Sequence, residues 1–100
     1  MDIDRELREV EKTGAVVLGS NETLKEIKTC RSKLVIITPN CPDSVRRNIV
    51  RNAEIKNVPL YFYGGDSEDL GLALGKPFLV SVAAVIDPGK SSILELGEKD

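Results

Sequence analysis

Hydrophobic residues along this chain recur with two different periods, and the alternation of these periods predicts the order of helices and strands. Apolar residues at every third or fourth position, separated by charged ones, are typical of amphipathic helices. Short uninterrupted runs of β-branched and aliphatic residues are typical of strands covered on both faces. Helices are therefore predicted at residues 3–12, 21–30, 43–56 and from about 67, and strands at 16–18, 33–38, 60–63 and 79–86, with an edge strand at 93–96.

Residues that typically start or stop helices define two of these boundaries more closely, the end of the helix at 43–56 and the start of the helix near 67. Asn57 suits a left-handed helix end, and Pro59 prevents the helix before it from continuing. Ser67 is a good N-cap for the short helix that follows, with Asp66 favoured near the positive end of its dipole. The predicted helices are thus short and separated by tight connections.

Strands that alternate with helices predict an α/β fold, a three-layer α/β/α sandwich around a mixed, mostly parallel central sheet. In such folds ligands bind at the loops beyond the carboxyl ends of the strands. These loops are predicted at residues 19–22, 39–42, 64–67 and 87–90.

Length and composition indicate one folded globular domain over residues 1–100. Hydrophobic residues make up 41% of the 100 residues and charged residues 30%. No apolar run approaches the roughly 20 residues that a membrane span needs, and the charged N-terminus does not resemble a signal peptide. We expect a cytoplasmic protein without a membrane partner.

Several catalytic chemistries are made improbable by the residues that the chain lacks. It contains no histidine, and its two cysteines, Cys30 and Cys41, do not form a C-x-x-C pair. A zinc site and a triad that uses imidazole are therefore not expected. We predict no metal site and no cofactor.

Charge is unevenly distributed although the net charge is only −2. Residues 20–60 hold eight basic and four acidic side chains, a net charge of +4, whereas the rest of the chain carries −6. A mixed, solvated surface would explain this distribution, so charge alone does not establish a nucleic-acid partner.

The segment from Gly19 to Lys25 adds the chemistry that charge alone lacks. A glycine opens a predicted helix whose first turn carries Asn21 and Glu22, with the ammonium group of Lys25 one turn later. The first helical turn also has unpaired backbone N–H groups. Donors, acceptors and a cation on one small surface suit contacts with base edges and phosphates, but they supply no nucleophile and base.

The apolar stretch at residues 77–84 is a second candidate contact. Its alternate residues are expected in the strand core, but Phe78 and Val80 near its start need not be buried. Beside the Gly19 segment they would form an apolar wall against which an unstacked base could lie.

An enzymatic alternative rests on Cys41 and Arg47, which match the C-x₅-R pattern of cysteine-dependent phosphatases. Pro42 removes one N–H group from the phosphate loop, and no glycine shapes that loop. We therefore predict a protein without enzymatic activity and keep the phosphatase as an alternative.

A series of motifs, taken together, resembles a known family. The sequence carries, in order, Gly19-Ser20-Asn21-Glu22-x-x-Lys25, the strand at 33–37, Val58-Pro59-Leu60-Tyr61, Leu70-Gly71-x-x-Leu74-Gly75-Lys76 and the strand at 80–86. This pattern resembles the kink-turn RNA-binding superfamily of archaeal and eukaryotic ribosomes over essentially the whole chain. Residues 75–78 and 87–94 look most like the "thirty-e" branch of the large ribosomal subunit. Residues 21–25 also resemble the "seven-Ae" branch, whose members serve in RNA-modification particles as well.

The resemblance implies a structural constituent of the large ribosomal subunit that binds kink-turn rRNA, in the cytoplasm, beside neighbouring ribosomal proteins and as a monomer when free. A kink-turn subunit of an RNA-modification particle is the alternative. By position, Gly19 would permit close backbone approach, Asn21 and Glu22 would meet guanine edges, and Lys25 would contact the RNA backbone. Apolar residues near the extruded base and adjacent candidates complete the implied RNA-binding set: Phe78, Val80, Ser81, Val82, Ser20 and Asn40.

Overall fold

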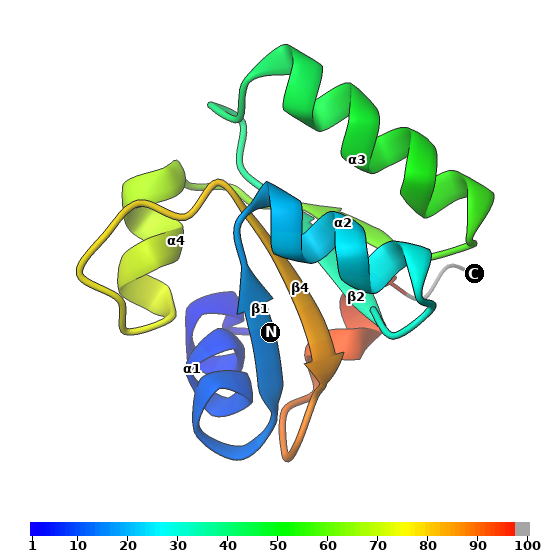
Figure 1. Cartoon of the computed structure of the whole chain (residues 1–100). Coiled ribbons are helices and arrows are strands. Elements are labelled where there is room, and N and C mark those ends of the chain that lie inside the picture. The colour runs from blue at the N-terminus through cyan, green and yellow to red at the C-terminus, as the bar shows by residue number, and fades with distance from the viewer. Residues whose placement is uncertain (98–100) are drawn as a thin grey trace.

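The computed structural model describes residues 1–97 and contains the predicted helices in the predicted order (Figure 1). The last three residues of the predicted 1–100 domain lie outside the described part. The elements are α1 (Ile3–Thr13), β1 (Ala15–Leu18), α2 (Ser20–Lys28), β2 (Leu34–Ile37), α3 (Asp43–Ile55), β3 (Leu60–Phe62), α4 (Ser67–Ala73), β4 (Val82–Asp87) and the 3₁₀ helix η1 (Ile93–Gly97).

The predicted three-layer α/β/α sandwich is confirmed. Helices α2 and α3 cover one face of the sheet, while α1, α4 and η1 cover the other (Figure 1). Alternate residues of β2 serve the two layers, because Leu34 and Ile36 pack toward α1 and α4 whereas Val35 and Ile37 pack toward α2 and α3. The sheet is therefore buried on both faces, as the uninterrupted apolar runs predicted.

The sheet is mixed, but its pairing differs from the predicted one. The strand order is β1-β4-β2-β3, and β4 runs antiparallel to both of its neighbours. Strands β1, β2 and β3 point the same way, yet only the β2–β3 pair is parallel. "Mostly parallel" is thus correct for strand direction and wrong for neighbouring pairs, because the last strand inserts between the first two.

The reversal of β4 changes which loops lie together. Leu18 at the end of β1 and Ile37 at the end of β2 pair with Ala83 and Val82 near the start of β4. Residues 78–81 therefore lie at the end of the sheet where 19–22, 39–42 and 64–67 gather. The prediction that 87–90 joins this group is wrong: that turn lies at the opposite end, where Lys90 N–H donates to Thr13 Oγ1 at 2.9 Å.

Three local predictions are also decided by the structure. Asn57 adopts the predicted left-handed conformation, with φ of 58°. The N-cap of α4 is Asp66 rather than Ser67, because Asp66 and Asp69 form a reciprocal capping box. The predicted edge strand at 93–96 is wrong, since Ile93 instead begins a 3₁₀ turn that fills the core beneath α1 and β3.

Among residues 1–97, no helix is both long enough and apolar enough to cross a membrane.

Candidate nucleic-acid interface

The N-terminus of α2 is an open helix end built around Gly19. This residue has φ of +91° and ψ of 158°, a conformation that essentially only glycine adopts, and it provides no side-chain cap. The first intrahelical bond is donated by Thr23 N–H to the Gly19 carbonyl at 3.0 Å. The N–H groups of the first turn are therefore left for an external acceptor. A Cβ atom at position 19 would meet no protein atom within 4 Å, so an approaching ligand has room.

The polar side chains of this helix end point into solvent. Asn21, Glu22 and Lys25 are exposed, and within the described residues their side chains form no hydrogen bond or ion pair. Ser20, by contrast, is half-buried. The three exposed groups are therefore available to a ligand without breaking an internal contact, and they carry one amide, one carboxylate and one ammonium group.

The loop at 77–82 is attached directly to this helix end. The N–H of Gly19 donates to the Val82 carbonyl at 2.8 Å. On the other side, the Ser81 carbonyl accepts from the backbone N–H of Thr38 at 2.9 Å and from its hydroxyl at 3.3 Å. The loop is thus held between the ends of β1 and β2, beside the first turn of α2.

Not every predicted apolar residue of this loop faces outward. Val80 and Val82 are 2% and 1% exposed and pack into the two core layers, so the prediction that the Val80 side chain helps to form an outward apolar wall is wrong. The exposed apolar side chains are Phe78 and Leu79, at 54% and 68%. Sequence reasoning did not single out Leu79. The signal that could have identified it is the pair of adjacent apolar residues, Phe78 and Leu79, directly before the buried Val80, where the loop leads into the strand.

Asn40 has an internal role in this structure. Its Nδ2 donates to Ser67 Oγ at 3.0 Å, and its Oδ1 accepts from Ser67 N–H at 3.1 Å. The Ser67 carbonyl in turn accepts from Val80 N–H at 3.0 Å. Asn40 therefore connects the loop after β2 to the start of α4 and, through it, to the 77–82 loop. It positions the interface rather than offering a free amide.

A shallow groove of about 300 Å³ continues the interface between α2 and α3. Its floor is apolar, with Leu24, Val45 and Ile49, and its rim is polar. Two rim residues from α3, Ser44 and Asn48, lie beside Ser20 and Asn21. Sequence reasoning missed both, because only the packing of α3 against α2 brings them to the helix end.

The comparisons with known proteins agree with this geometry. Residues 1–95 match the ribosomal protein L7Ae/L30e/S12e/Gadd45 family. The chain is 44% identical to "Large ribosomal subunit protein eL30" of Methanopyrus kandleri over 93 residues, which are 93% of this chain and 85% of that protein. It is 41% identical to the protein of the same name from Methanothermobacter thermautotrophicus, over 96% of this chain and 98% of the relative.

The chain belongs to the ribosomal protein L7Ae/L30e/S12e/Gadd45 family.

Within this family member, Cys41 does not have the surroundings of a phosphatase nucleophile. Its side chain is buried at 3% exposure, and burial raises the pKa of the thiol, whereas a nucleophile needs a lowered one. Arg46, rather than Arg47, lies over the loop, where its Nη2 donates to the carbonyls of Pro39 and Cys41 at 2.9 Å. The geometry and the family together favour a non-enzymatic ribosomal protein over the phosphatase alternative.

Proposed function

We propose that this chain is a structural constituent of the large ribosomal subunit and that it binds rRNA of the kink-turn type. The observation that carries the proposal is the junction of an open helix end, with three free polar side chains, and an exposed apolar loop held beside it by the bond from Gly19 to Val82. This combination suits RNA in which some bases are unstacked while others present their edges.

Each part of the surface matches a different part of such an RNA. The carboxylate of Glu22 can accept from the N1–H and N2–H₂ groups of a guanine, and the amide of Asn21 can pair with a base edge. Lys25 lies one turn further along and can neutralise a phosphate. Phe78 and Leu79 offer an apolar surface to an extruded base.

The location follows from the relatives. They are named as large ribosomal subunit proteins, which favours the ribosome over an RNA-modification particle. The chain would then act in the cytoplasm as a single kink-turn RNA-binding domain, beside other ribosomal proteins, and would be a monomer when free.

The decisive experiment replaces Glu22 with glutamine and measures binding to a kink-turn RNA and to a control RNA whose tandem G·A pairs are replaced by Watson–Crick pairs. Glu22→Gln keeps the shape of the side chain but removes one negative charge and half of its acceptor capacity. We expect a loss of about 1–3 kcal/mol on the kink-turn RNA and little change on the control. The matched variant is Glu54→Gln, which removes an exposed negative charge from α3 beside three arginines.

The two variants separate base reading from simple charge attraction. If the surface attracts RNA only through its charge, both variants should bind more tightly, since both remove a negative charge. If Glu22 reads guanine edges, only Glu22→Gln loses affinity. Equal or tighter binding of Glu22→Gln to the kink-turn RNA, in a protein shown to be folded by its thermal unfolding curve, would refute the proposal.

A further inference from the structure

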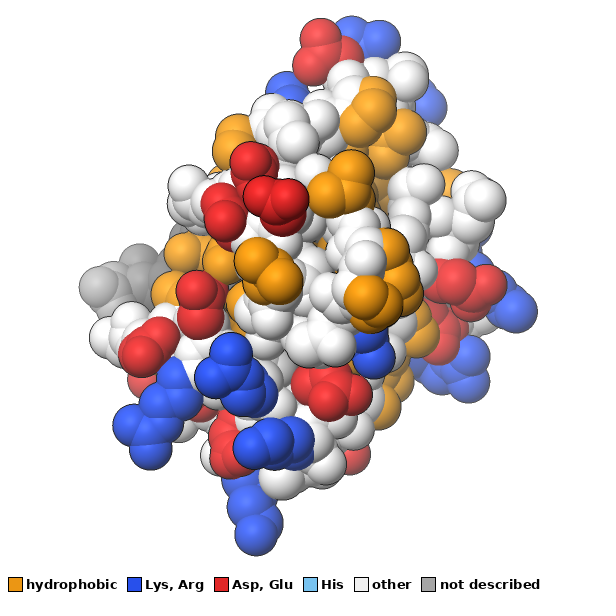
Figure 2. Space-filling view, turned by 90° about the vertical axis from the view of Figure 1, so that its left-hand side faces the viewer, with side chains coloured by type: hydrophobic (Ala, Val, Ile, Leu, Met, Phe, Trp, Pro, Cys, Tyr) orange, Lys and Arg blue, Asp and Glu red, His pale blue; other side chains and the backbone are white. Residues whose placement is uncertain are grey.

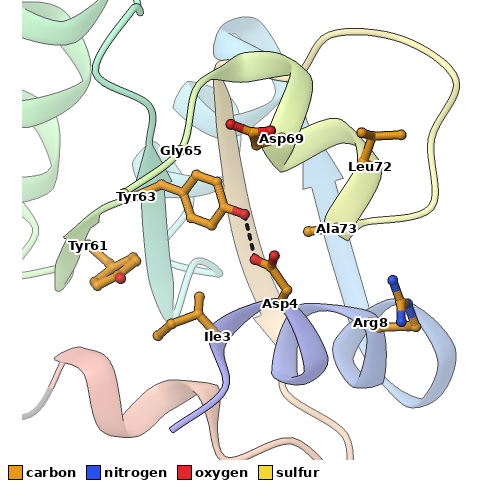
Figure 3. Close-up of a pocket in the computed structure, with 10 residues that line it drawn as sticks. Ile3, Asp4, Arg8, Tyr61, Tyr63, Gly65, Asp69, Leu72 and Ala73 are labelled. Atoms are coloured by element: carbon orange, nitrogen blue, oxygen red, sulfur yellow. Dashed lines mark hydrogen bonds between the residues drawn. The ribbon is translucent and has the colours of Figure 1, made fainter.

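A second hollow lies on the other layer of the sandwich and shares no residue with the nucleic-acid interface. It encloses about 500 Å³ between α1, the end of β3 and α4 (Figure 3). Its polar and aromatic lining consists of Asp4, Arg8, Tyr61, Tyr63 and Asp69. Both its size and its mixed lining are typical of a site that takes one extended side chain or small ligand.

Two carboxylates approach the same phenol inside this hollow. The hydroxyl of Tyr63 donates to Asp4 Oδ1 in a short hydrogen bond, and Figure 3 shows Asp69 on the other side of the hydroxyl in that view. Within residues 1–97, neither Asp4 nor Asp69 forms an ion pair. Burial, the bond to Asp4 and the charges of both carboxylates raise the pKa of Tyr63. The hollow therefore has negative charge that no cation of residues 1–97 neutralises by direct contact.

Gly65 keeps the hollow open. A Cβ atom at this position would lie 2.7 Å from Asp69 Oδ2, closer than real Cβ atoms approach, and 3.0 Å from Tyr63 Cε2, which is tighter than most Cβ contacts. The opposite wall is apolar and includes Leu72, which is 63% exposed although it is a large aliphatic side chain on a short helix. An apolar wall beside paired carboxylates suits a side chain with a hydrocarbon stem and a cationic head.

Arg8 lies at the side of the hollow and is the one cation that lines it among the described residues (Figure 3). It is exposed and forms no ion pair within the described part of the chain. Figure 2 shows this face of the molecule, where acidic side chains lie among apolar ones and basic side chains gather below them. A nucleic-acid phosphate would meet the two carboxylates, so the face does not extend the RNA interface.

We propose that this hollow receives an arginine side chain from a basic segment of a neighbouring ribosomal protein. A guanidinium group is planar, stacks on tyrosine rings and donates to two carboxylates at once, whereas an ammonium group does neither in a fixed geometry. The stem of the arginine would lie along Leu72 and Ala73. Its head would face the exposed carboxylates of Asp4 and Asp69 from the solvent side, because the Tyr63 hydroxyl already lies between them. The proposal rests on membership of a ribosomal protein family and is independent of kink-turn recognition.

The first test titrates the isotope-labelled full chain with an acetylated and amidated Gly-Gly-Arg-Gly-Gly peptide, followed by amide NMR shifts. The matched peptide carries citrulline, which has the shape of arginine without its charge. We expect saturable shifts at Gly64, Gly65 and Asp69, no shift at Asn21 and Glu22, and weaker binding of both the citrulline peptide and spermidine. Equal binding of the citrulline peptide or of spermidine would overturn the proposal.

Three variants are expected to change the affinity for the arginine peptide in opposite directions. Asp4→Asn keeps an oxygen that can accept the hydrogen bond from Tyr63, and Asp69→Asn keeps one for the bond from Asp66 N–H. Each substitution should weaken binding of the arginine peptide about two- to five-fold. Arg8→Gln should tighten binding of the arginine peptide by a similar factor, because the substitution removes the competing cation. All three should bind kink-turn RNA like the wild type, so a failure of the kink-turn proposal would be visible separately. Unchanged peptide affinity in all three variants would contradict the site.

The second test examines assembled ribosomes with p-benzoylphenylalanine in place of Leu72. Photoactivation should crosslink a protein segment that contains an arginine, as identified by peptide sequencing, and the Asp4→Asn/Asp69→Asn double variant should lower the yield. A crosslink to rRNA at this position would show that the hollow faces nucleic acid and would overturn the proposal.

Discussion

The backbone N–H of Gly19 donates to the carbonyl oxygen of Val82 at 2.8 Å, so one hydrogen bond joins the start of α2 to the first residue of β4, directly after the exposed loop. The two residues are far apart in the sequence, and each belongs to one half of the candidate interface. Polar side chains on the α2 side and apolar side chains on the loop side are therefore fixed relative to one another. Their separate contributions can be measured one residue at a time.

Lys25→Ala should weaken binding to many RNAs and make the dependence of affinity on salt shallower by about one counterion. The reason is that a lysine on a phosphate contributes mainly by displacing a bound cation. The measurement is the slope of log affinity against log salt concentration for the kink-turn RNA. Lys12→Ala, on α1 and at the opposite end of the sheet, removes the same charge and should leave the slope nearly unchanged. Equal slopes for both variants would argue against a phosphate contact by Lys25.

Phe78→Ala and Leu79→Ala should each weaken kink-turn binding by about 1–2 kcal/mol while leaving the salt dependence unchanged, because contact with a base releases few counterions. Both side chains are exposed, so the free energy of unfolding should change by no more than about 0.5 kcal/mol. Val80→Ala provides the contrast: it should destabilise the fold by about 1–3 kcal/mol, because Val80 is 2% exposed and packs in the core. Chemical unfolding and RNA titration of the three variants check this division. Unaltered RNA affinity in both exposed variants would remove the loop from the interface.

Gly71→Ala should lower both stability and RNA affinity. Gly71 is buried in α4, and a Cβ atom there would lie 2.2 Å from the carbonyl oxygen of Phe78, so the loop would have to move. Such overpacking typically costs about 1–3 kcal/mol. Gly64→Ala is the matched control, since its Cβ atom would meet nothing within 4 Å. Thermal unfolding and kink-turn titration should separate the two, and a Gly71→Ala protein with unchanged RNA affinity would mean that the loop position is unimportant.

Glu6→Gln should lower stability at neutral pH and lose that effect in acid. The Oε1 atom of Glu6 accepts from Ser92 N–H at 2.7 Å and from the Ser91 hydroxyl at 2.8 Å. These bonds, with the backbone donor contributing most, lower the pKa of Glu6 below its ordinary value of 4.5. A lowered folded-state pKa contributes stability above the unfolded-state pKa, and this stability is lost as pH falls through the folded-state value.

The measurement for this last prediction is urea unfolding of wild type and variant from pH 7 down to pH 3. The difference between the two curves should shrink as the pH falls below 4.5. Glu54→Gln controls for the general loss of one carboxylate. A difference that stays constant down to pH 3 would mean that ionised Glu6 does not hold the turn at residues 90–93.

The pattern of apolar residues determined the helices, all four strands of the sheet and its two buried faces, because these depend on local periodicity. It also determined the α2 motif, since Gly19 and the three polar residues Asn21, Glu22 and Lys25 lie close together in the chain, within the first two turns of one helix. The left-handed conformation of Asn57 and the end of α3 were predictable for the same reason, because both are set by Asn57 and its neighbours in the chain.

Only the tertiary structure decided the direction of β4, and several features depend on it. Hydrophobic residues in a strand buried on both faces read the same in either direction, so the sequence could not show that β4 inserts antiparallel between β1 and β2. That insertion brings residues 78–81 to the interface and sends 87–90 to the far end. It also buries Val80 and Val82 while leaving Phe78 and Leu79 in solvent. The Asn40–Ser67 bridge and the hollow around Tyr63 have the same origin, because long-range packing brings together residues that no local pattern connects.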